Sequence, residues 1–389
     1  MINSIKKQGY RSVMMAFMLA HAATDGFDAL FPPLLPLIRE YYNLSYSELG
    51  GFITLFRFFG GILQIPFGYL AYYVPSITIM VYGLLWLSVG LLIATFAKSY
   101  WTLASAFSVA GIGHATYHPL SFSILSKLFR REILGRIIGL HMGASSAAHL
   151  VGPFVVFLTA NRFGWYWPIR VWCLFGIFAA IFLLIVLSRH AEREQRGSEK
   201  ALKLPFISTS LILYVIFRIG WGAASKGMAE FLPLFLVETA QFSVNFATLY
   251  FMAMYLVELF ARPFVGNISD KFGKRKLFIL IECGICIIFF LTLTIFKTKW
   301  LLLFSILSIG FLAGTIPVVA NAYVIEMVPY EQRDRTMGYL FTANNAANTL
   351  SPLLTGFIAD NFGLMKSFII LSGILTLSLI SLFFSKENN

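Results

Sequence analysis

The chain has 389 residues, of which 58% are hydrophobic and only 12% are charged. A soluble protein carries about 25% charged residues, so this composition excludes an ordinary soluble domain and indicates an integral membrane protein. The net charge of +12 would also suit a nucleic-acid-binding protein. The positions of the basic residues, given below, favour a membrane topology instead.

An apolar run of about 20 residues is long enough for a helix to cross a bilayer, and a scan at that length predicts about twelve such runs. Their ranges are 12–38, 46–72, 77–97, 101–127, 134–160, 166–188, 205–236, 243–267, 277–296, 300–326, 336–359 and 365–385. One long polar interval, 189–204, separates them into equal groups. We therefore expect an all-α protein with an N-terminal six-helix bundle (1–188), a cytoplasmic linker (189–204) and a C-terminal six-helix bundle (205–389).

The Lys and Arg residues between the predicted spans lie mostly on the side that holds the linker and both termini. The opposite side holds only Arg39, Lys98, Arg162, Arg170, Lys297, Lys299 and Lys366. Because cytoplasmic loops carry an excess of basic residues, we expect both termini in the cytoplasm. The basic charge then reflects topology and not a nucleic-acid surface.

The first predicted span contains His21, Asp25 and Asp28, at spacings that place all three on one helical face. Ionisable groups at membrane depth are costly and usually face a bundle interior or a watery cavity. The competing interpretation places one or two of them in the headgroup region. A proline cluster then follows at Pro32, Pro33 and Pro36, where we expect the helix to break or kink.

Further ionisable residues in the first half are predicted to meet this face. Arg57 in the second span is a potential partner for Asp25 or Asp28, and His114 and His118 in the fourth span share one helical face. An imidazole titrates near neutrality, so a cavity-facing pair can exchange protons or bind a cation. His141 and His149 in the fifth span suit a packing role and a functional role equally well.

The second half offers candidate contacts for a cargo within its predicted spans. They are Arg218, Lys226, Glu230, Glu258, Asn344, Asn345 and Asn348. Lys226 and Glu230 are four residues apart and can simply neutralise one another, as can Glu258 and Arg262. The asparagines serve equally well as hydrogen bonds between helices. Glu282 lies near the cytoplasmic end of its span, where it can reach the membrane interface.

An internal repeat is visible between the two halves. A shift of 199 residues takes Gly111 to Gly310, Gly139 to Gly338, Pro153 to Pro352, Phe163 to Phe362 and Gly164 to Gly363, and a shift of 200 takes Pro33 to Pro233. Two equivalent halves with their termini on the same side are typical of parallel-repeat transporters, whose site lies between the halves.

The stretch Gly266–Lys276 reads GNISDKFGKRK and resembles the signature of the major facilitator superfamily, G-x-L-x-D-[RK]-x-G-[RK]-[RK]. It falls in the short loop after the second helix of the second half, where that family carries it. The resemblance implies a gating role for Gly266, Asp270, Lys271, Gly273, Lys274 and Arg275. In the first half Gly68 is kept, but Tyr72 replaces the acid, so a gate latch that uses this Asp would be weaker there.

Within that superfamily the chain resembles the fosmidomycin-resistance type of bacterial drug exporter. The similar stretches are 21–36, 111–119 and the run Gly135, Gly143, Gly152 and Pro153. The resemblance implies a multi-pass protein of the bacterial inner membrane that works as a monomer without a cofactor. It does not carry over the identity of the drug.

These features predict a secondary transporter that moves its cargo by alternating access. No G-x-x-x-x-G-K-[ST] motif occurs, so direct ATP drive is not expected. We predict proton coupling through Asp25 or Asp28, with His21, His114 and His118 assisting, and anion binding by Arg57, Arg218 and Lys226. The cargo would be a small organic anion or a drug.

Two other functions use the same sequence features. His21, Asp25, Asp28, His114 and His118 could together bind a divalent transition metal as cargo, either bare or as an anionic chelate such as a siderophore. A membrane enzyme or sensor is less consistent with the sequence, which shows no nucleophile with its base and has no room for a sizeable soluble domain. We therefore expect a protein that is not an enzyme.

Overall fold

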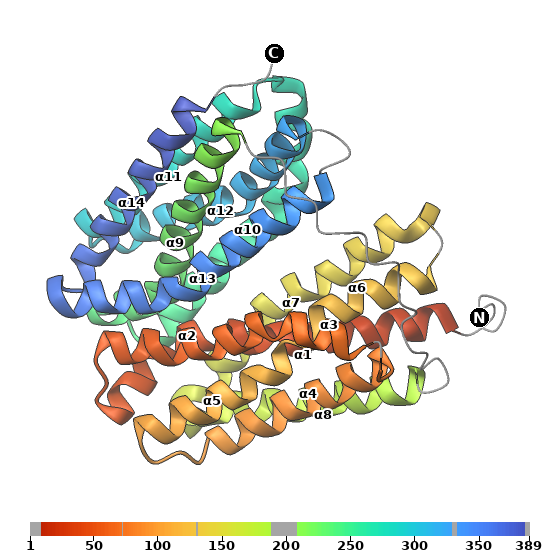
Figure 1. Cartoon of the computed structure of the whole chain (residues 1–389). Helices are drawn as coiled ribbons and strands as arrows, with labels where there is room; N and C mark the ends of the chain where they lie inside the picture. The colour runs from red at the N-terminus through yellow and green to blue at the C-terminus, as the bar shows by residue number, and fades with distance from the viewer. Residues whose placement is uncertain (1–8, 72, 130, 188–207, 329–332, 386–389) are drawn as a thin grey trace. The chain divides into compact units, whose positions relative to one another are not determined.

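The computed structural model describes residues 9–71, 73–129, 131–187, 208–328 and 333–385, and these residues form helices and short connections without strands (Figure 1). They cluster into two compact units. The first takes in Met1–Leu44 and Gly51–Lys200, and the second takes in Ser45–Gly50 and Ala201–Asn389. The predicted linker, 189–204, lies outside the described residues.

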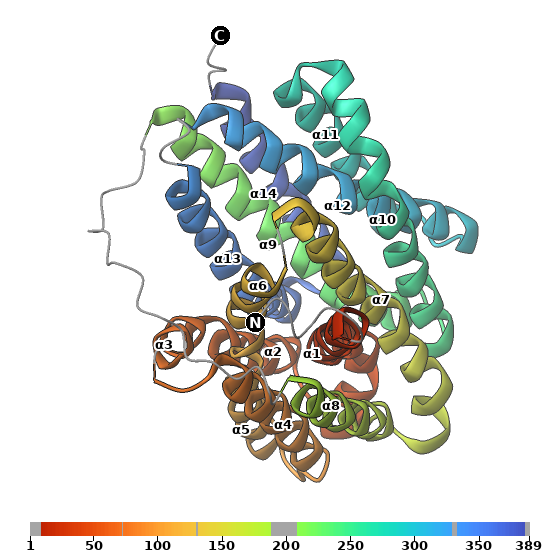
Figure 2. The ribbon, with the colours of Figure 1, turned by 90° about the vertical axis from the view of Figure 1, so that its right-hand side faces the viewer.

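Eight helices occupy the first part of the chain. They are α1 (Gly9–Tyr42), α2 (Tyr46–Ile62), α3 (Gln64–Leu70), α4 (Ser76–Ala94), α5 (Tyr100–His114), α6 (Tyr117–Leu128), α7 (Arg131–Phe163) and α8 (Tyr166–Leu187). In the first unit α1 packs against α7 and α8, and α4 packs against α5 and α8 (Figure 2). The polar face of α1 is thereby turned toward helices that are far from it in sequence.

Six helices follow in the second unit. They are α9 (Thr209–Glu238), α10 (Val244–Phe272), α11 (Arg275–Ile295), α12 (Lys299–Met327), α13 (Arg333–Phe362) and α14 (Leu364–Phe384). α9 packs against α13 and α14, and α12 packs against α10 and α11. Each of the twelve predicted spans thus corresponds to helix, which confirms the predicted fold class.

Two predicted spans are each divided into two helices, for a reason that the sequence contains. The 46–72 span divides at Leu63 and the 101–127 span divides at Ala115 and Thr116. Pro66 lacks the N–H that would bond the carbonyl of Ile62, and Pro119 lacks the one that would bond Ala115. Each proline therefore lies in the first turn of the new helix, where it is tolerated.

The expected break of α1 at its proline cluster is wrong. α1 includes Pro32, Pro33 and Pro36 and continues to Tyr42. Its neighbouring apolar side chains Phe31, Leu34 and Leu35 are fully buried. Tertiary packing on this segment therefore outweighs the backbone hydrogen bonds that the prolines remove.

The repeat in the sequence is also a repeat in local structure. α4 and α11 begin 199 residues apart, and so do α5 and α12. Gly164 and Gly363 follow α7 and α13 with positive φ angles of 98° and 88°, and each donates its N–H to a carbonyl four residues earlier at 2.8 Å. Only glycine takes such angles without strain.

Eight helical segments among the described residues are long and apolar enough to cross a bilayer. They belong to α2 with α3, α4, α7, α8, α10, α11, α12 and α14. α1, α9 and α13 do not reach this limit, although each is long enough, because they carry the buried polar residues described below. Polar membrane helices of this kind normally line a functional site.

Candidate functional site

Ionisable side chains from four helices meet inside the first unit. This group, called the α1 charge cluster below, consists of His21, Asp25 and Asp28 on α1, Arg57 on α2, His114 on α5 and His118 on α6. Their side chains range from 1% exposed for His21 to 28% exposed for His118. This packing favours an interior position for Asp25 and Asp28 over a position among the lipid headgroups.

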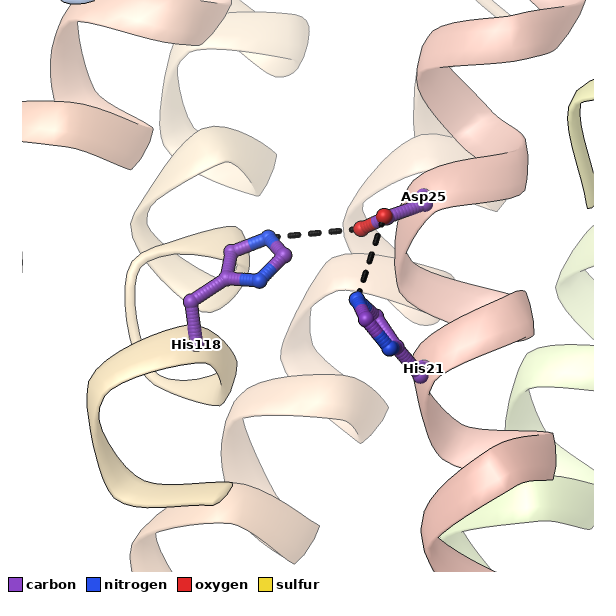
Figure 3. Close-up of side chains that lie close together, drawn as sticks. All are labelled: His21, Asp25 and His118. Carbon is purple, nitrogen blue, oxygen red and sulfur yellow. Dashed lines mark ion pairs between the residues drawn. The ribbon is translucent and has the colours of Figure 1, made fainter. Parts of the chain in front are cut away.

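Asp25 lies between two imidazoles (Figure 3). His21 Nε2 is 3.2 Å from Asp25 Oδ2, and His118 Nε2 is 3.3 Å from Asp25 Oδ1. Ser145 on α7 donates its hydroxyl hydrogen to Asp25 Oδ2. Each carboxylate oxygen therefore faces a group that can carry a proton.

The His21 ring has a fixed hydrogen-bonding pattern. Its Nδ1 lies 2.8 Å from the carbonyl oxygen of His141, and because a carbonyl only accepts, Nδ1 carries a hydrogen. Nε2 is the ring nitrogen that faces Asp25 Oδ2. One nitrogen of His21 is therefore held by the backbone, and the other is presented to the carboxylate.

Asp28 has different partners from Asp25. Arg57 Nε donates to Asp28 Oδ1 at 3.1 Å, and His114 Nε2 lies 3.2 Å from Asp28 Oδ2. A guanidinium is always protonated in proteins, so Arg57 provides a permanent positive charge beside Asp28. Of the two partners proposed for Arg57, the structure selects Asp28.

Two further residues position the imidazoles of the cluster. The His141 ring is fully buried and stacks on His21 with 4.1 Å between ring centroids. Tyr117 is buried beside both rings and donates its hydroxyl hydrogen to the Phe17 carbonyl at 2.5 Å. His149 Nδ1 lies 2.9 Å from the Ser145 carbonyl oxygen, and because a carbonyl only accepts, Nδ1 is the donor.

Part of the cluster also has the spacing of a metal site. One ligand atom each of His21, Asp25 and His118 lies within 4.8 Å of the others. Imidazole nitrogen and carboxylate oxygen suit divalent transition metals. Asp28 and His114 from the predicted metal set do not join this group.

Arg218 on α9 is the buried cation of the second unit. It is 7% exposed, and among the described residues its Nη1 has no hydrogen-bond partner and its guanidinium has no acid within ion-pair distance. Lys226, by contrast, lies 2.9 Å from Glu230, which is 1% exposed. Lys226 and Glu230 thus neutralise one another, whereas Arg218 is a fixed charge without a counter-ion in this part of the chain.

The other candidates in the second unit contact protein groups. Glu258 is paired with Arg262 on the same helix. Asn344 and Asn348 on α13 face α9, where their side-chain oxygens leave no space for a Cβ on Gly222. Asn345 is exposed. Both asparagines therefore pack closely on Gly222, and the buried Oδ1 of Asn344 accepts no hydrogen bond from the described residues.

The stretch that resembles the family signature, Gly266–Lys276, covers the end of α10, the connection Gly273–Lys274 and the start of α11, so the expectation that it lies in a loop is wrong for most of its residues. Gly273 ends α10 with a φ of 69°, a conformation that glycine adopts readily. Arg275 contacts Glu326 on α12 at 2.7 Å and Ser269 at 2.8 Å. Lys271 and Lys274 are exposed. The structure does not describe Tyr72 or the surroundings of Gly266 and Asp270.

Sequence reasoning missed several polar partners. Ser145 and Tyr117 carry no charge, so only the fold reveals that they contact Asp25 and His21. Sequence reasoning also did not predict a partner for Glu282, which is 6% exposed and accepts a hydrogen bond from Thr315 on α12. An acid within an otherwise apolar span was the available signal.

Comparison with known proteins places the whole chain in one family. The family model described as "Major Facilitator Superfamily" matches residues 17–293 and 229–388. The uncharacterized MFS-type transporter YwfA of Bacillus subtilis is 22% identical over 376 residues, covering 93% of this chain and 89% of that protein. The multidrug resistance protein MdtG of Salmonella typhi is 30% identical over 172 residues, which are 43% of this chain and 42% of that protein.

Solved structures share the fold. A bacterial homolog of the human lysosomal transporter Spinster, in an inward-facing and unoccupied conformation, has a TM-score of 0.83 at 16% identity, covering 98% of this chain and 97% of that chain. The nucleoside transporter NupG has a TM-score of 0.79 at 13% identity, covering 96% and 100%. With two matches of the family model along the sequence, this chain belongs to the major facilitator superfamily and is a multi-pass membrane transporter, not an enzyme.

Proposed function

We propose that this transporter is driven by protons and carries a small organic anion or an acidic drug by alternating access. The bundles 1–188 and 205–389 would move against each other around a central site, with 189–204 as their cytoplasmic linker. The single observation that supports proton coupling best is the position of Asp25 between His21 and His118, at 3.2 and 3.3 Å.

The chemistry of this arrangement suits a proton carrier. A carboxylate between two neutral imidazoles has a net charge of −1, and one added proton makes the group neutral. A neutral group costs less to bury than a charged one, so the loaded site can pass through an occluded state more easily. Imidazole is the side chain whose ordinary pKa lies closest to physiological pH, so it is suited to passing a proton to a carboxylate and taking it back.

Asp28 is less suited to coupling than Asp25. Arg57 is a permanent cation 3.1 Å from Asp28, so protonating Asp28 would leave a buried guanidinium without its counter-charge. We therefore assign the coupling proton to Asp25, with His21 and His118 as its partners. Asp28, Arg57 and His114 form a charged group in which an anionic cargo can compete with Asp28 for Arg57.

The substrate class follows from the cation of the second unit. Burying an unpaired guanidinium is costly unless an anion compensates it. Arg218 is such a group within the described residues, and a carboxylate or phosphate would satisfy its planar donors. Asn344, whose Oδ1 accepts no hydrogen bond from the described residues, and Asn345 remain candidate cargo contacts. Lys226 pairs with Glu230 and Glu258 pairs with Arg262.

One of the named relatives, MdtG, is consistent with export. MdtG is described as a multidrug resistance protein, and we propose drug efflux by proton antiport across the inner membrane, as the resemblance to the fosmidomycin-resistance type implies. The gating residues Gly266, Asp270, Lys271, Gly273, Lys274 and Arg275 would act where α10 ends and α11 begins. We propose a monomer as the working unit.

A divalent metal as cargo has one observation in its favour, the spacing of His21, Asp25 and His118. The nearby Arg57 opposes a bare cation electrostatically, although an anionic chelate would tolerate it. A thermal shift with zinc, nickel or cobalt ions that is absent in His118→Ala would be required for this reading.

The proposal is tested with purified protein in proteoliposomes under an imposed pH gradient, screened over organic anions and drugs. We expect Asp25→Asn to abolish gradient-driven flux while it retains exchange of labelled for unlabelled substrate, because only the proton step is lost. Asp28→Asn serves as the matched variant and is expected to weaken substrate binding. Gradient-driven flux at the wild-type rate in Asp25→Asn would remove Asp25 from the coupling role.

A further inference from the structure

A second buried carboxyl group lies in the second unit, outside the proposed transport residues. Glu282 on α11 is 6% exposed. Its Oε1 accepts a hydrogen bond of 2.6 Å from the Thr315 hydroxyl on α12, and its Oε2 has no partner among the described residues. Within the same residues, no Lys, Arg or His lies at ion-pair distance from it.

The internal repeat provides a reference for what this position needs. A shift of 199 residues relates Glu282 to Gly83, on α4, and Thr315 to Thr116, between α5 and α6. Thr116 donates to the carbonyl of Gly113 at 2.9 Å, and Thr315 lies in the same relation to Leu312 at 3.3 Å. The two threonines therefore occupy equivalent places in the two units.

In the first unit, the residue that corresponds to Glu282 is a glycine, and it lets α4 pack closely against Thr116. A Cβ added to Gly83 would overlap the side chain of Thr116, so α4 approaches the threonine as closely as its backbone allows. In the second unit the carboxyl group of Glu282 fills the corresponding space and takes a hydrogen bond from Thr315. The first unit shows that these helices can pack without an acid at this position, so packing alone does not explain why Glu282 is present in the second unit.

The surroundings of Glu282 favour the protonated form of its carboxyl group. An ionised carboxylate in a buried place needs a cation or several hydrogen-bond donors, and the described surroundings supply one hydroxyl. Other titratable groups on α11 are Cys283, Cys286, Lys276 and Arg275, the last of which pairs with Glu326 on α12. Neighbouring helices add Arg218 on α9, whose charge acts on Cys283, Glu258 on α10 with its partner Arg262, Tyr323 on α12 and Lys366 on α14.

We propose that Glu282, hydrogen-bonded to Thr315, is a second proton-binding site of this transporter, separate from Asp25. Its ligand is the proton and not a metal cation, because hard cations such as Mg²⁺ and Ca²⁺ take six or more oxygen ligands and this place offers few. The site exists in the second half of the repeat and not in the first. It does not depend on Asp25 being the coupling residue.

Infrared spectroscopy of the purified protein in lipid nanodiscs tests this site without a substrate. A protonated carboxyl group gives a C=O stretching band that an ionised carboxylate lacks. We expect such a band at neutral pH that is lost in Glu282→Gln and shifted in Thr315→Val, because that variant removes the hydroxyl donor and keeps the side-chain shape. The band should shift in D2O and disappear reversibly as the pH is raised.

Glu258→Gln is the matched control, since Glu258 is a half-buried acid of the same unit that is paired with Arg262. This variant should leave the band unchanged. Asp25→Asn should also leave it in place, so failure of this site and failure of proton coupling at Asp25 are distinguished. A spectrum of Glu282→Gln that retains every protonated carboxyl band would overturn the proposal. So would a band that neither exchanges in D2O nor responds to pH, or one that sodium ions remove at constant pH.

Discussion

At the scale of single residues, the partners of a charge determine what it can do more than its type or spacing. Asp25 and Asp28 are both aspartates on one face of α1, yet one meets two imidazoles and the other meets a guanidinium. Arg218 and Arg262 differ in the same way, because Arg262 is paired with Glu258 while Arg218 has no acid beside it in the described residues.

Arg218→Gln should therefore stabilise the protein without substrate. Removal of a buried cation that lacks a counter-ion relieves a desolvation cost, and we expect a gain of about 1–3 kcal/mol in the free energy of unfolding. The variant should also lose any stabilisation by anionic ligands. Thermal unfolding in detergent, with and without those ligands, measures both effects.

Arg262→Gln is the control for this measurement, and it should lower the melting temperature because it leaves the mostly buried Glu258 without its partner. A melting temperature of Arg218→Gln below that of the wild-type protein would show that Arg218 has a stabilising partner and would contradict the anion-site assignment.

The sequence could identify the charged residues of the site but not their pairing. Spacing along α1 was enough to place His21, Asp25 and Asp28 on one face, since that follows from helix geometry. Arg57 is 29 residues from Asp28, and Ser145 is 120 residues from Asp25. His118 is also far from Asp25 in the sequence. Which partner meets which acid depends on helix packing, which no local pattern encodes.

At the scale of helices, the repeat makes equivalent contacts in the two units. Gly111 on α5 lies against the carbonyl of Phe56 on α2, and Gly310 on α12 lies against the carbonyl of Met254 on α10. In both places a Cβ would overlap backbone, which cannot move as a flexible side chain can. The shift of 199 in the sequence was enough to predict that these glycines are equivalent, and the contact they make explains why glycine occurs at both.

Gly111→Ala and Gly310→Ala should destabilise the protein to a similar extent. Forcing a methyl group into a packed contact costs about 1–3 kcal/mol, because the helices must separate locally. Gly139→Ala is a control on α7, where nothing lies within 4 Å of the added carbon and no loss is expected. Melting temperatures of the three variants decide the matter, and an unaffected Gly310→Ala would disprove the equivalence of the two contacts.

Helix breaks show where local sequence signals compete with packing. Pro66 and Pro119 divide their spans, whereas Pro33 and Pro36 do not divide α1. A proline removes the same hydrogen bond in each case, so its identity alone cannot predict the outcome. α1 packs against α7 and α8 with fully buried side chains beside its prolines, and that packing is known only from the fold.

At the scale of the whole molecule, composition and periodicity predicted most of the architecture. Apolar runs of membrane length are read directly from the sequence, and the structure has a helix or a helix pair at each of them. The orientation in the membrane rests on the distribution of Lys and Arg alone. It therefore needs an independent test.

We expect both termini in the cytoplasm and the connection between α11 and α12 on the opposite side. Lys297 lies in that connection and Lys299 is the first residue of α12. They are two of the few basic residues predicted on the outer side, so this connection is where the charge rule is most open to error. A green fluorescent protein fused to the C-terminus should be fluorescent, and alkaline phosphatase fused there should be inactive, because each matures on one side only. Alkaline phosphatase inserted after Lys297 should be active. The reverse result at both positions would invert the topology, and with it the direction in which a proton gradient could drive the cargo.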